Sequence, residues 1–284
     1  MRMRKIFSEL QEMGADFGER KLPLYASSAT YSIAIAMVPV VMLIVSLVQF
    51  LPITEGDILN YLREWMPEQV MTVVSDIITG IYSGGKTAFT VSILLTVWSA
   101  SAAMRAIMRG IQAVYDDGST PASQNIVVFY LRAILYMVVF VVILLLSFVI
   151  MAQGEAILRL LMRIFPDDDP LHAIAPYLRY GRFVVVTAIL LAVFILMFRF
   201  IPARKVRLRA QVPGAVFSAL SWVVFSLGFS YYIGLSNHLG AYGIIGTSMI
   251  AMLWLYYCLL FLLAGAWLNC WLEKKRREKE GEVS

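Results

Sequence analysis

The chain has 284 residues, of which 60% are hydrophobic and only 15% charged, against about 25% charged in ordinary soluble domains. This balance excludes an ordinary soluble enzyme or binding domain, because a soluble fold would need an unusually large core to bury several apolar runs of membrane-spanning length. The formal charge of +5 permits nucleic acid or anionic lipid as a partner, so the positions of the basic residues must decide.

Six apolar runs, each near or above the ~20 residues that cross a bilayer, predict transmembrane helices. They lie at 24–51, 87–107, 127–153, 183–201, 213–235 and 242–271. The first run is much longer than the apolar region of a signal peptide, so we expect it to stay uncleaved. The predicted fold is therefore all-α and polytopic, divided into an N-terminal cytoplasmic segment (1–23), a six-helix membrane domain (24–272) and a charged cytoplasmic tail (273–284).

Amphipathic segments are predicted outside the membrane between the first two spans. Apolar side chains recur there at spacings of three and four from Ile58 to Ile81, with acidic residues between them. This pattern indicates one or two helices lying on the outer surface, broken near Pro67. The loop at 154–182 has a similar character, whereas the loop between spans five and six is so short that those helices must be antiparallel neighbours.

The distribution of lysine and arginine predicts the orientation. Of the 24 basic residues, all but Arg63, Lys86, Arg159, Arg163, Arg179 and Arg182 fall in the segments that share a side with the N-terminus. Because lysine and arginine resist translocation, both termini are expected to be cytoplasmic. The same rule explains the basic surface without a nucleic-acid partner, so none is expected.

The stretch VWSASAAMRAIMRGIQAVYDD at 97–117 is predicted to leave the membrane on the cytoplasmic side. Arg105 and Arg109, four residues apart, share one helix face at the level of the lipid phosphates, where their side chains can snorkel. Ala102, Ala106 and Gly110 form a small-residue stripe suited to close helix packing. The pattern leaves open whether the two arginines only anchor the helix or also contact a cargo headgroup.

Signatures of catalysis are missing from the sequence. Both histidines, His172 and His238, are predicted on the outer side, without metal-ligand spacing, and no phosphate-binding glycine loop is present. We therefore expect no enzyme activity, cofactor or metal. No Asp, Glu, Lys or His falls near the middle of a predicted span, which disfavours a proton antiporter. Hydroxyl side chains in spans one, five and six either pack helices, the favoured interpretation, or line a mildly polar cavity.

Three stretches resemble the YihY/BrkB family of bacterial inner-membrane proteins. They are YSIAIAMVP at 31–39, WSASAAMRAIMRGIQAVY at 98–115, and IPARKVRLRAQVPGAVFSALSWVVFSLGFSYYI at 201–233 followed by YGIIGTSMIAMLWLYY and GAWLN. The resemblance covers 24–269 and implies six membrane helices in the cytoplasmic (inner) membrane. The family has carried the labels ribonuclease BN and virulence factor, and a transport role is suspected for it. Two positions depart from the family pattern: Ala36 stands where serine is frequent, and Trp267 where an acidic residue is common.

Three functions are weighed. The leading hypothesis is a transporter or flippase-like protein for an amphipathic, lipid-related cargo. The alternative is a scaffolding protein of the envelope that binds anionic lipid. A ribonuclease is disfavoured, because RNA cleavage needs a general base or metal site. Expected partners are membrane lipids with anionic headgroups, and a homo-oligomer stays open. Candidate binding residues for cargo or headgroup are Tyr31, Ser99, Ser101, Arg105, Arg109 and Tyr242. Candidate helix-geometry residues are Pro39, Pro213, Gly214, Gly243 and Gly246.

Overall fold

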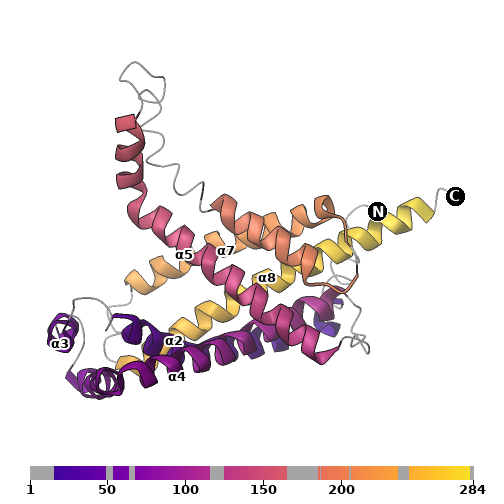
Figure 1. Ribbon diagram of the computed structural model, residues 1–284. Coiled ribbons are helices and arrows are strands. Elements are labelled where there is room, and N and C mark those ends of the chain that lie inside the picture. Colours follow the sequence, from indigo (N-terminus) through magenta and orange to yellow (C-terminus); the bar gives the residue numbers. More distant parts are fainter. Residues whose placement is uncertain are drawn as a thin grey trace. The chain divides into compact units, whose positions relative to one another are not determined.

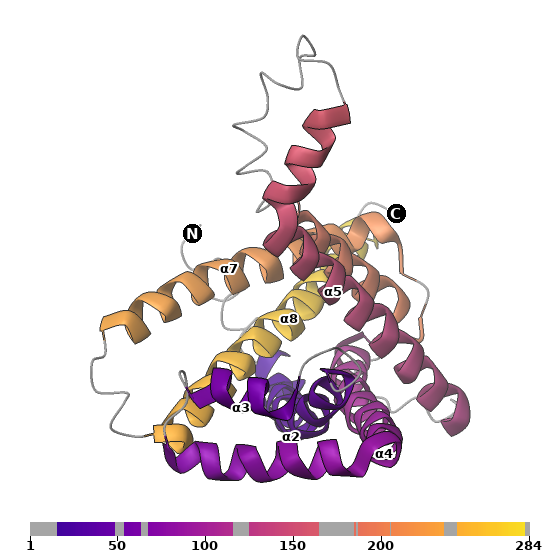
Figure 2. The same cartoon turned by 60° about the vertical axis from the view of Figure 1, so that its left-hand side comes forward.

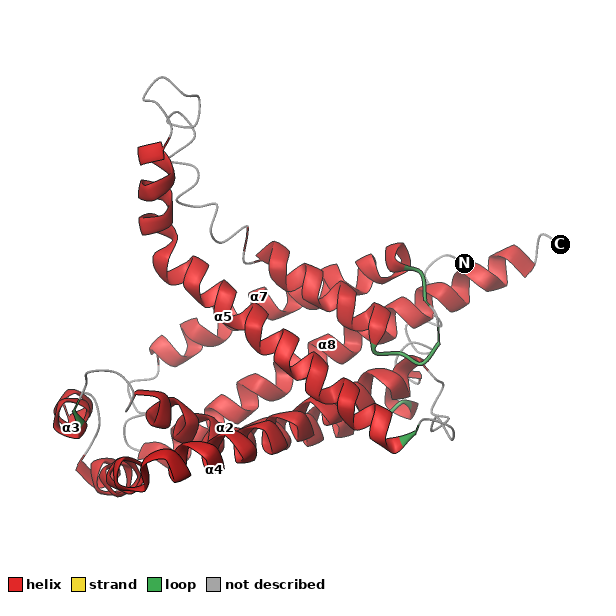
Figure 3. Cartoon of the chain, in the orientation of Figure 1, coloured by secondary structure: helices red, strands yellow, loops and turns green. Residues whose placement is uncertain are grey.

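Most of the part of the chain that the structure, a computed structural model, describes is helical, with short loops and turns between the helices (Figure 3). The described residues are 16–48, 54–63, 68–115, 125–164, 185, 187–204, 206–235 and 243–281. No strand occurs within these ranges. The predicted all-α class is confirmed.

The described residues form the following helices in chain order, and Figure 1 labels all of them except η1. They are α2 (Leu22–Val48), α3 (Glu55–Arg63), α4 (Glu68–Tyr115), α5 (Ile126–Ile164), the 3-10 helix η1 (Leu208–Gln211), α7 (Val212–Leu235) and α8 (Gly243–Gly281). A shorter apolar helix, Thr187–Phe200, lies between α5 and η1 in sequence.

Five of the helical segments described are long and apolar enough to cross a membrane. They are Leu22–Leu47, Val74–Tyr115, Ile126–Ser147, Leu208–Ile233 and Gly246–Glu278. The chain is therefore a polytopic membrane protein, as its sequence predicts. The predicted fourth span, 183–201, includes the apolar helix Thr187–Phe200, and several residues before Thr187 lie outside the described part of the chain. The count of six spans and the cytoplasmic termini stay predictions.

Span two is predicted to begin near Thr87, and this start lies just past the kink at Gly85 that divides α4 (Glu68–Tyr115). The arm before the kink includes the second half of the predicted outer-surface segment, and the arm after it continues past the predicted end at residue 107 to Tyr115. The two arms of α4 meet at a kink, where Gly85 has φ 50° and ψ −131°, and they run in different directions (Figure 2). Only glycine adopts this backbone conformation readily, so the Gly84-Gly85 pair permits the bend.

Two further helices are longer than predicted. The helix α5 continues past Gln153 to Ile164, and α8 continues through residue 272, the predicted start of the charged tail, as far as Gly281. Charged residues are good helix formers when they are solvated, so a change in polarity does not end a helix. The division of the chain at 272 therefore marks a change in composition inside one helix.

The contacts divide the chain into two compact units, which are treated separately. Unit 1 comprises Met1–Leu22, Met108–Leu227 and Leu260–Ser284, and unit 2 comprises Pro23–Ile107 and Gly228–Leu259. Within unit 2, α2 and α4 are joined by polar contacts: Thr96 donates to the carbonyl of Pro39 across 2.8 Å, and the hydroxyls of Ser46 and Ser92 lie 3.2 Å apart. Both bonds satisfy hydroxyl groups within an apolar helix pair, as membrane packing requires.

Within unit 1, α7 and α8 cross at very close range. A Cβ atom placed on Gly265 would overlap the Ser218 hydroxyl and the Gly214 carbonyl, so only glycine fits at the crossing. The Ser218 hydroxyl donates to the carbonyl of Phe261 across 2.9 Å. One turn further along α8, Asn269 accepts from the Gly214 N–H at 2.7 Å and donates to the Gln211 carbonyl at 3.1 Å. Asn269 thereby fixes the start of α7 against α8, which positions the site described next.

Candidate functional site

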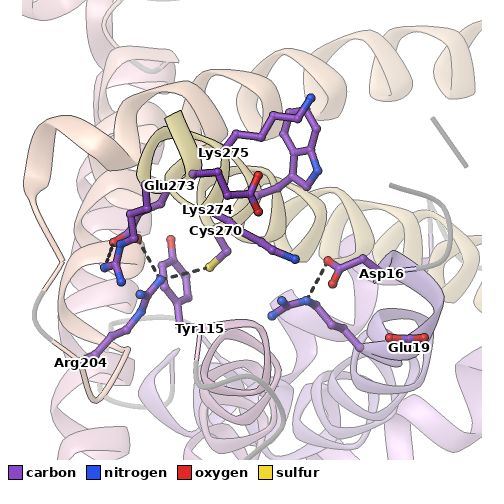
Figure 4. Close-up of a pocket in the computed structure, with 12 residues that line it drawn as sticks. Asp16, Glu19, Tyr115, Arg204, Cys270, Glu273, Lys274 and Lys275 are labelled. Atoms are coloured by element: carbon purple, nitrogen blue, oxygen red, sulfur yellow. Dashed lines mark hydrogen bonds and ion pairs between the residues drawn. The ribbon is translucent and has the colours of Figure 1, made fainter. Parts of the chain in front are cut away.

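A charged cavity of about 590 Å³ lies within unit 1 (Figure 4). Its walls come from the turn at 16–20, the end of α4, the bend at 201–204 and the last part of α8. Its volume falls in the ~300–1,000 Å³ range of small-molecule sites. The lining residues are Asp16, Glu19, Arg20, Tyr115, Arg204, Cys270, Trp271, Glu273, Lys274, Lys275, Arg277 and Glu278.

Asp16 anchors the first of two charged clusters in the cavity wall. Its carboxylate accepts from Arg20 Nε at 2.9 Å and from the indole N–H of Trp267 at 2.5 Å. Burial alone would raise the pKa of Asp16, but the hydrogen bonds from Trp267 and Arg20 and the charges of Arg20 and Lys274 outweigh it and lower that pKa. Asp16 is therefore ionised over the physiological pH range.

The short turn that carries Asp16 is held in place by its own backbone and by aromatic packing. Lys21 adopts a left-handed φ of 54° and donates its N–H to the Gly18 carbonyl at 3.1 Å, which ends the turn before α2 begins. The ring of Phe17 packs edge-on against Trp267, with centroids 5.6 Å apart. Arg20 also donates to the carbonyl of Val114, near the end of α4. The N-terminal turn is thus attached to both α4 and α8.

Glu273 anchors the second cluster. It accepts from Arg204 at 2.9 Å and from Arg277 at 2.6 Å, so one carboxylate serves two guanidinium groups. The guanidinium of Arg204 also lies 5.5 Å from the ring centroid of Tyr115, within cation–π range, and 3.7 Å from Cys270 Sγ. Figure 4 shows Arg204, Glu273 and Cys270 together on one side of the cavity and Asp16 on the other.

The charged residues that line the cavity differ in how deeply they are buried. On the inner wall, Arg20, Arg204 and Lys275 accompany the carboxylates of Asp16 and Glu273, and these five side chains are partly buried. At the rim, the exposed residues Glu19, Lys274, Arg277 and Glu278 balance one another. Lys275 lies 4.2 Å from the ring centroid of Trp271, which holds its ammonium group at the wall. The less screened inner part therefore carries an excess positive charge and favours an anion.

Unit 2 has a groove of opposite character, with a volume of about 500 Å³. It lies between α2 and the two arms of α4 on either side of the Gly85 kink. Apart from Asp76, its lining is apolar: Met37, Val38, Val41, Met42, Ile77, Gly80, Ile81, Ala88 and Val91.

None of the predicted binding residues lines the charged cavity. Tyr31 is 63% exposed on α2, whereas Ser99 and Ser101 are buried and donate to carbonyls of their own helix at 2.8 Å. Arg105 donates to the Ser101 hydroxyl at 2.9 Å, one turn back, and Arg109 is exposed. Tyr242 lies outside the described residues. The structure therefore places Ser101 and Arg105 together.

The predicted helix-geometry residues lie at informative places. Pro39 is inside α2, Pro213 is in the first turn of α7, and Gly214 forms the crossing with α8. Gly243 is the first residue of α8, and Gly246 follows in its first turn. In the predicted small-residue stripe, Ala106 and Gly110 are buried and Ala102 is partly buried.

Sequence reasoning missed the residues that build the cavity. Two local signals were present: Asp16 with Arg20, and Glu273 with Arg277, are opposite charges four residues apart. Such pairs usually mark a solvated helix face, so they did not stand out. Within the described ranges, no group of three or more His, Cys, Asp or Glu side chains could hold a metal ion, and both histidines lie outside those ranges.

Comparison with known proteins places the chain in a family. Residues 13–283 match the family described as Virulence factor BrkB. The chain is 26% identical to YfkH of Bacillus subtilis, a protein with a ribonuclease-like name, over 89% of this chain and 90% of that protein. It is 23% identical to a UPF0761 membrane protein of Aggregatibacter aphrophilus, over 93% and 91% of the two chains.

A shorter match joins the chain to a UPF0761 membrane protein of Chromobacterium violaceum, 34% identical over 35% of this chain and 23% of that one. No solved structure matches. Together with the apolar helices of membrane-spanning length, the family match over residues 13–283 shows that this chain is an integral membrane protein of the BrkB family.

Proposed function

We propose that this protein is a transporter or flippase-like protein for an amphipathic, lipid-related cargo. The observation that carries the proposal is the charged cavity of about 590 Å³ in a chain whose helices are otherwise apolar. Small-molecule sites are cavities of this size in which a few polar or charged groups orient the ligand. A cavity with charged walls suits the polar end of an amphipathic molecule.

The apolar groove of unit 2 supports the second half of the same proposal. Its lining offers hydrocarbon contacts and a single carboxylate, Asp76. A protein that handles an amphipathic cargo needs surfaces of both kinds, polar for the headgroup and apolar for the chain. The two units supply these two chemistries separately.

A scaffolding role is the second candidate, and the pairing inside the cavity favours it. Asp16 binds Arg20 and Trp267, and Glu273 binds Arg204 and Arg277, so the charged groups of the wall also hold helix ends together. In a scaffold, these contacts would serve only to present a stable surface to anionic lipid. Transport and scaffolding therefore differ in whether the cavity is needed for movement of a molecule.

The experiment that separates them is lipid movement in proteoliposomes. The full chain is reconstituted with fluorescent phosphatidylethanolamine, phosphatidylglycerol or phosphatidic acid, and the exchange between leaflets is followed by quenching from outside. We expect the protein to accelerate exchange of at least one lipid and Arg204→Gln to slow it about tenfold or more, the effect of losing one charge-assisted contact.

Arg209→Gln is the matched control, because Arg209 is an exposed arginine of the nearby η1 helix that does not line the cavity. It should exchange lipid at the rate of the unaltered protein. If folded protein moves none of the lipids faster than protein-free liposomes, the transport proposal is wrong for this class of cargo and scaffolding gains support. An RNA-cleaving role is not proposed, because such chemistry needs a general base or a metal site.

A further inference from the structure

Arg204 is the residue of the cavity best suited to recognise a ligand. Its terminal nitrogen donates to Glu273 at 2.9 Å and more weakly to Cys270 Sγ at 3.7 Å, and its guanidinium lies over the Tyr115 ring. Its Nε–H, however, is buried and has no acceptor among the residues that the structure describes. Buried donors are nearly always paired, so a shift of the partly exposed Arg204 side chain toward an acceptor in the cavity would stabilise this donor.

The charge of the inner wall indicates the sign of that ligand. Arg20, Arg204 and Lys275 outnumber the carboxylates of Asp16 and Glu273, and each carboxylate is shared between two donors. The acidic groups that restore the balance, Glu19 and Glu278, are exposed at the rim, where water and salt screen them. An anion in the cavity would therefore meet a net attraction.

Among anions, a phosphomonoester fits these donors better than a carboxylate does. It carries about −1.5 to −2 charges at pH 7 and three strong acceptor oxygens, whereas a carboxylate carries one charge on two oxygens. Arginine is the side chain that binds phosphate most specifically, through several N–H donors in a planar group. Three oxygens could reach Arg204 and the basic groups from the turn and from α8 together.

We propose that the cavity of unit 1 binds a phosphomonoester group, with Arg204 as its main ligand. The inference rests on the proposed function in so far as the phosphate is expected at the end of an amphipathic molecule. The same chemistry is found in a lipid headgroup, as in phosphatidic acid, and in a soluble phosphate. Binding of the group and its movement across a membrane are measured separately.

The test uses the full chain in nanodiscs of phosphatidylcholine, titrated with glycerol 3-phosphate by calorimetry. We expect saturable binding that is absent for glycerophosphocholine, a phosphodiester whose single negative charge is balanced by its choline group. Arg204→Lys keeps the charge but removes the Nε–H, and it should weaken binding about tenfold or more. Arg209→Lys, the matched substitution outside the cavity, should bind as the unaltered protein does. Equal weakening by both variants, or no binding of glycerol 3-phosphate, would overturn the proposal.

A second variant tests whether weaker binding by Arg204→Lys could come from misfolding alone. Glu273→Gln removes the carboxylate that competes for Arg204 and Arg277 while keeping the shape of the side chain. We expect it to bind glycerol 3-phosphate several-fold more tightly, a gain that misfolding cannot produce. Unchanged or weaker binding by this folded variant would contradict a phosphate site at Arg204.

Nanodiscs that contain phosphatidic acid identify the source of the phosphate. If the lipid occupies the cavity, it should raise the apparent Kd for glycerol 3-phosphate, and Arg204→Lys should abolish this competition. Without competition, the site takes the soluble phosphate, and the proposal holds for that source. If phosphate binds but no lipid moves in proteoliposomes, the transport function fails while the phosphate site stands.

Discussion

Trp267 donates its indole N–H to a carboxylate oxygen of Asp16 across 2.5 Å, although the two residues are 251 positions apart. The family resemblance places an acidic residue at the position of Trp267, and in this chain the N-terminal turn brings a carboxylate to that same place. This carboxylate comes from the N-terminal turn, where Arg20 pairs with its charge and the indole donates a hydrogen bond to it.

The hydrogen bond between Trp267 and Asp16 should hold the N-terminal turn on α8. Trp267→Phe keeps an aromatic ring against Phe17 but removes the donor, and we expect it to destabilise the turn by about 1 kcal/mol or less, because Asp16 is partly exposed. Faster hydrogen exchange at residues 17–21 would show this. Trp271→Phe, which leaves Asp16 untouched, is the control and should not alter exchange in the turn.

The same contact predicts a pH dependence. The lowered pKa of Asp16 means that its ionised form is favoured in the folded protein. Its contribution to stability is complete above the ordinary aspartate pKa of about 3.9 and is lost as the pH falls through the lower folded value. A fluorine label on the Phe17 ring should report loosening of the turn only in that acidic range. In Asp16→Asn, the label should show no such transition; an identical transition would assign it to another group.

Asn269 is predicted to be essential to the packing of α7 on α8. Asn269→Leu leaves the Gly214 N–H and the Gln211 carbonyl without their partner in a buried place. Each unpaired group costs about 1–3 kcal/mol, so a loss of about 2–5 kcal/mol is expected. Thermal unfolding in detergent, followed by size-exclusion chromatography, measures it. Leu268→Ala, at the preceding position of the helix, is the comparison. A smaller loss of stability for Asn269→Leu than for Leu268→Ala would refute the prediction.

The glycine crossing should not tolerate even one methyl group. Gly265→Ala puts a Cβ into the Ser218 hydroxyl and the Gly214 carbonyl, and backbone cannot move aside as a flexible side chain can. Overpacking of this kind costs about 1–3 kcal/mol. Gly228→Ala in α7 is the control, because a Cβ there meets nothing within 4 Å, and it should be neutral or slightly stabilising. Similar melting temperatures for both variants would argue against the close crossing.

The kink in α4 should depend on Gly85. A Cβ added at residue 85 meets no atom within 4 Å, so no clash is expected. The loss of stability in Gly85→Ala comes instead from the backbone φ of 50°, which alanine rarely adopts, and is about 1–3 kcal/mol. We expect the variant to lose stability or to straighten the helix, which distances between spin labels at the exposed positions Thr79 and Leu94 would detect. Gly80→Ala, in a regular part of the same arm, should leave the distance unchanged.

Much of the fold follows from the sequence, because membrane spans are recognised from long apolar runs that need no partner to be identified. The spans beginning at residues 24, 127, 213 and 242 all match helices. At α4 the sequence predicts an outer helix followed by a span from about Thr87, and the kink at Gly85 divides the helix at that place. Helical periodicity continues on both sides of Gly85, so the pattern does not show that the two arms are continuous.

The candidate site was less predictable, because its residues are distant in the chain. Reasoning from the sequence favoured Ser99, Ser101, Arg105 and Arg109, whose shared helix face is visible in a single stretch. The cavity instead brings together Arg20, Tyr115, Arg204 and α8, and only tertiary contacts reveal this. Of the quoted motifs, GAWLN came nearest, since its Gly265, Trp267 and Asn269 make contacts that position the cavity.

The continuity of α8 has a consequence for how this protein can vary. Gly265, Asn269 and Glu273 follow one another at intervals of one turn, so about 6 Å of rigid helix separates each from the next. A substitution that shifts the crossing at Gly265 also shifts the carboxylate that holds Arg204. Changes at these three positions should therefore be epistatic, and a variant that replaces Glu273 should need compensating changes along the same stripe.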